Sequence, residues 1–191
     1  MFGRISILAA TAIMVVAARA EGNNLVQNGG FETGDFSDWS VTGHGGTEVN
    51  GTGLYVEPND YSGVQGEAYG SHSGNYYCYF GPIGGDSTIS QSITDTLGTT
   101  YQLAYWVAGD GTGPSNLEVF WNDVLVSGIS GPIPSQPYTP YAVDVTGTGL
   151  DALEFGMRDD PAADALDDIT LTPALFPNRD RFRCWASSHW S

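Results

Sequence analysis

The chain is 191 residues long, carries a formal net charge of −16 and contains no lysine. Between Glu21 and Ala174 a single basic residue, Arg158, stands against 21 Asp and Glu residues. A surface this acidic repels phosphate groups, so nucleic acid and anionic lipid headgroups are not expected partners, whereas neutral glycans and divalent cations remain compatible. Solubility outside the cell is a simpler reason for the same charge.

The first twenty residues have the three parts of a secretory signal peptide. A short segment with Arg4 precedes an apolar stretch from Ile7 to Ala18, and Ala18-Arg19-Ala20 is a cleavage site with small residues at both specificity positions. The stretch is shorter than the roughly 20 residues that a membrane-spanning helix needs. We therefore expect residues 1–20 to be removed on export. Residues 21–174 are then expected to form one domain that is secreted or held at the cell surface.

The body of the chain has short runs of alternating apolar and polar residues, separated by Gly, Asn, Asp and Pro. No segment has a sustained helical period, so the pattern predicts an all-β, two-sheet jelly-roll β-sandwich of about eight strands. Asn122-Asp123 is typical of a tight hairpin turn. In chain order the strands are expected within residues 75–80, 87–94, 101–107, 117–121, 124–126, 141–145, 153–155 and 169–171.

The two cysteines lie in different surroundings. Cys78 falls within an aromatic run and is expected to be a buried free thiol that packs as a small apolar residue. Cys184 lies in the C-terminal segment, which differs in composition from the rest of the chain. Two cysteines can pair in an oxidising compartment, but they do not make a disulfide framework.

Both ends of the predicted domain carry motifs of a known group. Residues 24–32, Asn-Leu-Val-Gln-Asn-Gly-Gly-Phe-Glu, followed by Trp39, resemble the opening of galactose-binding-like β-sandwiches, which include CenC-type carbohydrate-binding modules. Residues 166–171, Leu-Asp-Asp-Ile-Thr-Leu, resemble the last strand of the same group. The resemblance covers nearly all of residues 22–174 and implies a galactose-binding-like jelly roll. It says less about function, because this fold hosts many unrelated sites.

Three central segments and the C-terminus suggest a second relationship. Residues 72–76, 80–82 and 101–106 resemble exported bacterial proteins that end in a PEP-CTERM sorting signal, which is V-P-E-P, an apolar span and a basic cluster. Read one base earlier, the codons for Cys184-Trp185-Ala186 give Leu-Gly, and the stretch from Leu175 can give V-P-E-P-G-S. We interpret residues 175–191 as an unstructured tail from a frameshifted sorting signal, so this form is expected to lack a stable membrane anchor. A genuine disordered tail is the alternative.

The resemblance also implies a structural metal. Such modules often hold Ca²⁺ between the N-terminal segment and the acidic residue of the last strand. Carried onto this sequence, the ligands are Glu32, Asp167 or Asp168, with carbonyl oxygens near Gly29 and Gly30, a donor set that suits a hard cation. The alternative is a set of solvated acids and a hydrogen-bonded turn.

The orientation of Asp167 bears on that metal. In a regular strand Asp167 shares a face with Ile169 and Leu171, so its side chain is expected to point inward. A lone carboxylate is costly in an apolar interior, and a bound cation would relieve the cost.

Alternation also predicts aromatic rings on the outer faces of the sheets. If Tyr101, Leu103 and Tyr105 face the core, Trp106 faces away, and the same argument applies to the other strands. Outward rings and polar groups together are typical of a glycan-binding surface, although such rings also stiffen sheets by cross-strand pairing. The expected ligand-binding residues are Tyr77, Tyr79, Trp106, Phe120, Gln102 and Glu118.

Catalysis has little support in the sequence. His44 and His72 have no partner at metal-ligand spacing, and no nucleophile elbow is present. We therefore predict an exported, non-catalytic protein that binds extracellular or cell-surface glycans. The alternative is a calcium-stabilised structural protein of the cell surface or matrix with no sugar site.

Overall fold

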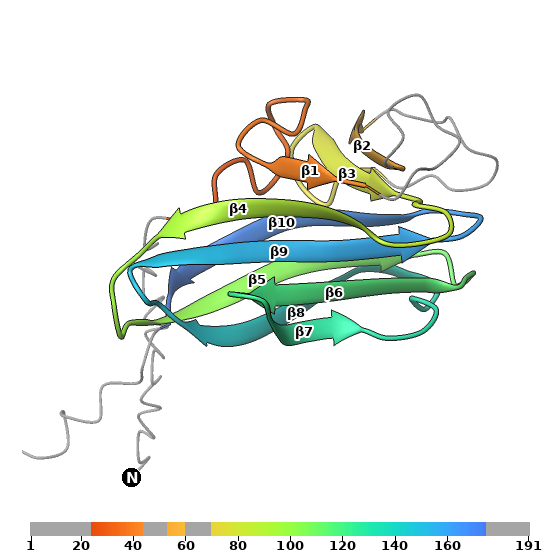
Figure 1. Cartoon of the computed structure of the whole chain (residues 1–191). Helices are drawn as coiled ribbons and strands as arrows, with labels where there is room; N and C mark the ends of the chain where they lie inside the picture. Colours follow the sequence, from red (N-terminus) through yellow and green to blue (C-terminus); the bar gives the residue numbers. More distant parts are fainter. Residues whose placement is uncertain (1–23, 44–52, 60–69, 175–191) are drawn as a thin grey trace, which may run out of the picture.

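The computed structural model describes residues 24–43, 53–59 and 70–174, which form two packed antiparallel sheets and no helix (Figure 1). Within these ranges there is accordingly no helix with the length and apolarity to span a membrane. The expected signal peptide, His44, Cys184 and the tail after Ala174 lie outside the described residues.

Each sheet contains five strands. In spatial order, sheet I consists of β1 (Ser40–Thr42), β4 (Ser87–Thr94), β9 (Leu150–Asp159), β6 (Ser115–Trp121) and β7 (Val124–Ile129). Sheet II consists of β2 (Leu54–Pro58), β3 (Tyr76–Phe80), β10 (Asp164–Pro173), β5 (Thr100–Gly109) and β8 (Gln136–Thr146). The predicted all-β, two-sheet sandwich is thus confirmed.

The core lies between the two sheets and is built from the inward members of each alternating strand. Tyr105 of β5 and Phe155 of β9 meet edge to face, with ring centroids 5.4 Å apart. Phe155 in turn meets Trp39, whose other neighbour is Phe31. Such aromatic contacts bury large apolar areas and add about 1 kcal/mol per pair beyond the burial itself. Cys78 is a fully buried free thiol in this core, as predicted, and burial raises the pKa of its thiol.

The hairpin between β6 and β7 turns at the predicted residues. Asn122 and Asp123 have φ values of 51° and 62°, the left-handed region that a type I′ turn requires at both central positions. Asn and Asp adopt this region more readily than most residues do.

Two strands were not anticipated from the sequence. β1 is only three residues long and exposed, so it carries no alternation that a pattern could detect. β2 pairs with β3 at the edge of sheet II and contains a proline at its end. Short edge strands of this kind are held by their neighbours more than by their own propensity.

The N-terminal segment runs beside the last strand. The amide of Leu25 donates to the carbonyl of Leu171, and the amide of Ile169 donates to the carbonyl of Gly29. A Cβ on Gly29 would lie 2.1 Å from the Ile169 carbonyl oxygen, so no side chain fits at this crossing. The segment and β10 therefore form one unit in which residues 24–32 reach the bulged part of β10.

Candidate functional site

The six expected ligand residues divide between the two outer faces of the sandwich. Phe120 and Glu118 lie on β6, where the inward side chains are Leu117, Val119 and Trp121, so both point off sheet I. The other four point off sheet II, on the opposite side of the molecule. One ligand cannot contact both groups across the sandwich.

Tyr77 and Tyr79 lie on the outer face of sheet II but are not exposed. Their relative exposures are 1% and 7%, because they pack in a second apolar cluster with Ala108, Ala163 and Ala165. Tyr55 and Tyr138 pack against the same cluster. The expectation that these two rings are open to a ligand is therefore wrong, although their direction away from the main core was predicted correctly.

Trp106 also lies on the outer face of sheet II and is partly exposed, as the alternation of β5 predicts. Its ring stacks on the imidazole of His72, with centroids 3.8 Å apart and planes 17° from parallel. Tyr138 meets the same imidazole edge to face at 5.4 Å. The indole is thus held in one orientation by a residue from a different part of the chain.

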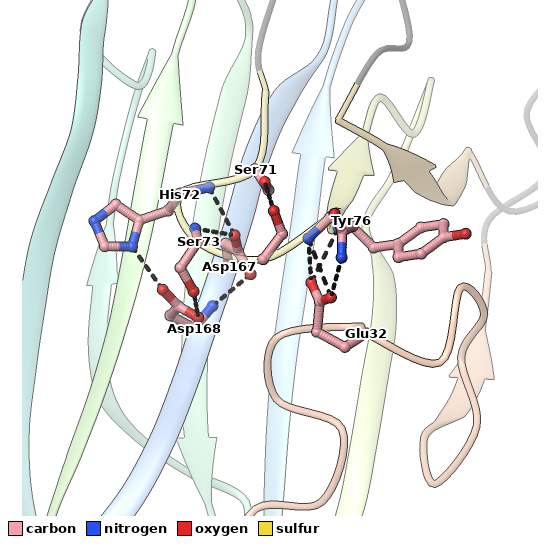
Figure 2. Close-up of polar contacts among 9 residues, drawn as sticks. Glu32, Ser71, His72, Ser73, Tyr76, Asp167 and Asp168 are labelled. Atoms are coloured by element: carbon pink, nitrogen blue, oxygen red, sulfur yellow. Dashed lines mark hydrogen bonds and ion pairs between the residues drawn. The ribbon is translucent and has the colours of Figure 1, made fainter.

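A carboxylate fixes His72 in turn. Its Nδ1 lies 2.6 Å from Oδ2 of Asp168, and the hydroxyl of Ser73 donates to the other oxygen of Asp168 at 2.8 Å (Figure 2). The backbone amide of His72 donates to Oδ2 of Asp167 at 2.8 Å. Acidic residues of β10 therefore bind both the backbone and the side chains of this turn.

Glu32 binds the other half of the same loop. Its carboxylate accepts hydrogen bonds from the amides of Asn75 at 2.9 Å and Tyr76 at 3.0 Å (Figure 2). Gly74, which lies between the part of the loop bound by β10 and the part bound by Glu32, has a φ of 67°. A Cβ at Gly74 would lie within 3 Å of the Glu32 carboxylate. Residues 71–76 are consequently held against β10 and the N-terminal segment by three carboxylates from two distant parts of the sequence.

A β-bulge changes the expected orientation of Asp167. The register of β10 against β5 shifts between Asp167 and Thr170, and Asp168 has a φ of 49°. Because one extra residue is inserted, Asp167 pairs with Trp106 on the outer face while Ile169 and Leu171 face the core. The expectation that Asp167 points inward with Ile169 is therefore wrong.

Asp167 is nevertheless fully buried, because residues 71–73 cover it. Burial raises the pKa of its carboxyl to about 7, and the neighbouring charge of Asp168 adds to the effect. Hydrogen bonds from the amides of Asp168, His72 and Ser73 act in the opposite direction. This carboxyl is the most perturbed acid in the immediate surroundings of Trp106.

The five expected metal ligands do come together. A Cβ on Gly30 would lie 3.3 Å from Oδ1 of Asp168 and 3.8 Å from Oδ1 of Asp167 and from Cγ of Glu32. The carbonyl of Gly29 accepts the amide of Ile169, and the carboxylates accept the N–H and O–H groups described above. These oxygens are thus paired with protein donors, the arrangement of the hydrogen-bonded turn.

Trp106 belongs to a regular array of outward side chains that three strands of sheet II present. The pairing of β8, β5 and β10 places three residues in each row across the sheet. We call this array the outer strip. Its rows are Pro140, Trp106 and Asp167; Ala142, Ala104 and Thr170; and Asp144, Gln102 and Thr172.

The outer strip has an aromatic end and a polar end. Ala104 and Ala142, with their small side chains, belong to the middle row next to Trp106. Asp144 and Gln102 at the far end of the strip are exposed. An amide and a carboxylate side by side offer both donors and acceptors to a hydroxylated ligand. Asp144, Thr170 and Thr172 were missed in the sequence because alternation gives the face of a residue but not which strands are neighbours.

No protein-family model matches the sequence, and no curated protein matches it. Solved structures of several kinds share the fold. A family 61 carbohydrate-binding module in complex with β-1,4-galactotriose has a TM-score of 0.55 and 19% identity over 79% of this chain and 99% of its own. A family 16 carbohydrate-binding module, module 2, has a TM-score of 0.53 and 18% identity over 78% of this chain and 99% of its own.

The third similar structure is an enzyme. A cyclase from Fischerella sp. TAU, in complex with an indolyl butanone, has a TM-score of 0.57 and 14% identity over 79% of this chain and 98% of its own. The TM-scores establish a shared fold. At identities this low they say nothing about the ligand or the activity, which have to be argued from the site itself. The described domain is therefore a β-sandwich with the architecture of solved carbohydrate-binding modules.

Proposed function

We propose that this chain is a non-catalytic glycan-binding protein whose binding surface is the outer strip, with Trp106 as its aromatic platform. The observation that carries the proposal is the fixed, partly exposed indole of Trp106 at one end of a strip whose other end presents the polar side chains of Gln102 and Asp144. Sugar rings present C–H faces that pack on such rings, and their hydroxyls bind amides and carboxylates.

Preorganisation supports the same surface. The stacking of His72 on Trp106, and the bond from His72 to Asp168, hold the indole before any ligand arrives. A side chain that is already ordered loses less conformational entropy on binding than a mobile one. This matters for sugars, whose contacts with protein are individually weak.

The ligand is proposed to be a neutral, extended glycan. Residues of one face repeat along a strand at about 6.6–6.8 Å, so three rows offer contacts to a short linear oligosaccharide. The domain carries one Arg against 21 acids, which disfavours acidic polysaccharides. The galactotriose in the similar family 61 module makes β-1,4-linked galactan a reasonable first probe.

Export is part of the proposal, since extracellular polysaccharides are found only outside the cytoplasm. The pattern of residues 1–20 supports it. N-terminal sequencing of secreted protein should give Glu21 as the first residue. Recovery of intact Met1 protein from the cytoplasm would remove this part of the proposal.

A structural Ca²⁺ between the N-terminal segment and β10 is a separate proposal. The gathering of Gly30, Glu32, Asp167 and Asp168 around residues 71–76 supports it, and Ca²⁺ would supply positive charge there. The hydrogen-bonded turn without an ion is the competing arrangement.

The glycan proposal is tested by isothermal titration with neutral oligosaccharides and two aromatic variants. Trp106→Ala should abolish binding, whereas Phe120→Ala, which removes an outward ring from the opposite sheet, should leave it unchanged. Equal loss in both variants would move the site away from the outer strip. If the intact chain binds no neutral glycan across a broad array, the structural alternative replaces the proposal.

A further inference from the structure

Three aspartates that belong to neither the outer strip nor the expected metal ligands meet at one end of the sandwich. Asp110 follows β5, Asp159 ends β9 and Asp164 begins β10. One carboxylate oxygen from each lies within 4.8 Å of the other two. Because β9 belongs to sheet I while β5 and β10 belong to sheet II, this cluster joins the two sheets where the chain passes from β9 to β10 (Figure 1).

The cluster contains buried carboxylate oxygens that have no donor. Asp159 and Asp164 both have a relative exposure of 0%. Neither oxygen of Asp159 has a hydrogen-bond partner among the residues that the structure describes, and the same is true of Oδ2 of Asp164. Desolvating a carboxylate without a compensating partner is strongly unfavourable. The arrangement therefore lacks a positively charged or donating component.

A second buried aspartate on the same strand shows how the fold treats a purely structural carboxylate. Asp151, at the other end of β9, also faces the interior, with 2% exposure. It accepts hydrogen bonds from the side chain of Asn122 and from the amide and hydroxyl of Thr148. Burial opposes the ionisation of Asp151, but these bonds, together with one to the neighbouring carboxyl of Asp95, outweigh it and lower its pKa.

The pKa directions at the cluster are the reverse of that at Asp151. Burial raises the pKa of Asp159, and the charges of Asp164 and Asp110 raise it further. Burial likewise raises the pKa of Asp164, despite the amide of Asp110 that donates to it at 3.0 Å. Three carboxylates therefore meet at this cluster, where the described donors reach one oxygen of Asp164 and neither oxygen of Asp159.

No Lys or Arg among the described residues pairs with the cluster. Arg158 is the only Lys or Arg in the described ranges, and its guanidinium pairs with Asp160 at 3.2 Å. Asp110 binds the amide and hydroxyl of Thr112, both at 2.6 Å, which fixes its carboxylate but adds no positive charge. A bound cation would supply the component that the described residues lack.

We propose that Asp110, Asp159 and Asp164 bind a Ca²⁺ ion that ties the two sheets together. Oxygens within 4.8 Å of one another can all lie at the 2.3–2.6 Å that Ca²⁺ prefers, since two ligands on opposite sides of the ion are then about 4.8 Å apart. The site is separate from Glu32, Asp167 and Asp168.

The donor set selects the class of ion. All three side chains supply hard carboxylate oxygens, and no His or Cys belongs to the group, which disfavours Zn²⁺ and other borderline or soft metals. Mg²⁺ takes shorter bonds and keeps most of its water, so a buried cluster contributed by three strands suits Ca²⁺ better. The remaining ligands would be water or nearby backbone carbonyls.

The experiment is calcium titration of the full chain after removal of metal with EDTA, followed by calorimetry and thermal unfolding. A Ca²⁺ concentration about 100 times Kd should raise the Tm by about 8 °C. Mg²⁺ at the same concentration should give a much smaller shift. The Asp159→Asn and Asp164→Asn variants should lose this calcium-dependent shift and one bound ion per chain.

Two comparisons keep the result specific. Asp159→Asn should melt at or above the wild type in EDTA, because the carboxylate that it removes has no donor, and below the wild type in Ca²⁺. Asp151→Asn, a matched change on the same strand, should melt lower in both conditions and keep the full calcium shift. Asp167→Asn should leave the Asp159-dependent ion in place.

The proposal is overturned if wild type and Asp159→Asn show the same calcium-dependent shift and the same number of ions. It is equally overturned if Ca²⁺ changes neither Tm nor heat of binding.

Discussion

The imidazole of His72 and the indole of Trp106 form a stacked pair, 3.8 Å between centroids, although they come from a loop and a strand 34 positions apart. The pair connects the carboxylates that hold residues 71–76 with the aromatic platform of the outer strip. Asp168 holds His72, and His72 holds the aromatic ring on which a sugar would pack.

This stacking predicts that His72 affects glycan binding through Trp106, without a contact of its own with the ligand. His72→Ala should weaken glycan binding about 2- to 10-fold, since a stacked pair contributes about 0.5–1.5 kcal/mol. His72→Phe keeps a flat ring beside Trp106 but loses the bond to Asp168, so it should recover most of the affinity. Titration calorimetry with the same oligosaccharide measures both, and full affinity in His72→Ala would contradict the role.

The carboxylates around residues 71–76 predict a chelator effect. If Ca²⁺ lies between Glu32 and Asp167, EDTA should lower the Tm of the Asp159→Asn variant, in which the other proposed site is absent. Adding Asp167→Asn to that variant should abolish the remaining effect. Identical melting of Asp159→Asn with and without EDTA would mean that the hydrogen-bonded turn is complete without an ion.

Stability in EDTA should fall as the pH rises from about 5 to about 8. The pKa of Asp167 is about 7 in the folded protein against 3.8 for the free group, and the pKa values of Asp159 and Asp164 are also raised. When a carboxyl has a higher pKa in the folded protein than in the unfolded chain, the free energy of unfolding falls as the pH rises from the unfolded pKa to the folded pKa. Asp167 alone should contribute on the order of 2 kcal/mol, or about 6 °C in Tm.

The matching control is Asp167→Asn, which should flatten part of this pH dependence. Thermal unfolding at fixed ionic strength, in steps between pH 5 and pH 8, provides the measurement. A Tm that rises between pH 5 and pH 8 would contradict the raised pKa values of these buried carboxyl groups.

The contact between Gly29 and β10 predicts a severe effect from one methyl group. In Gly29→Ala the new Cβ would lie 2.1 Å from the Ile169 carbonyl oxygen, so the N-terminal segment has to move away from the bulge. We expect a loss of about 2–4 kcal/mol, by analogy with other overpacked sites. Gly156→Ala is the control, because its Cβ meets atoms only at 3.8 Å and 3.9 Å. Chemical denaturation of both variants tests the difference.

The fold could be predicted because its strands alternate clearly. The inward set Tyr101, Leu103, Tyr105 and Val107 places Trp106 and Gln102 outward without further information. The Asn122-Asp123 turn likewise carries its own backbone preference. Features of this kind are local, so a single sequence contains them.

The site was predicted only in part because its decisive features are not local. The bulge at Asp168 reverses the direction of Asp167, and its left-handed φ depends on the surrounding contacts. The burial of Tyr77 and Tyr79 comes from Tyr55 and Tyr138, which lie on other strands. The approach of Asp110 to Asp159 and Asp164 spans some fifty residues and two sheets.

The pairing of the N-terminal segment with β10 has a consequence for how the domain can be rearranged. Leu25 is hydrogen-bonded to Leu171, three residues before Ala174, so the two ends of the described domain leave it side by side. Domains with adjacent ends tolerate circular permutation and insertion into other proteins. A short linker from residue 174 to residue 24, with new ends at the Asn122-Asp123 turn, would keep every other strand connection and could insert the sandwich into a host loop as a self-contained unit.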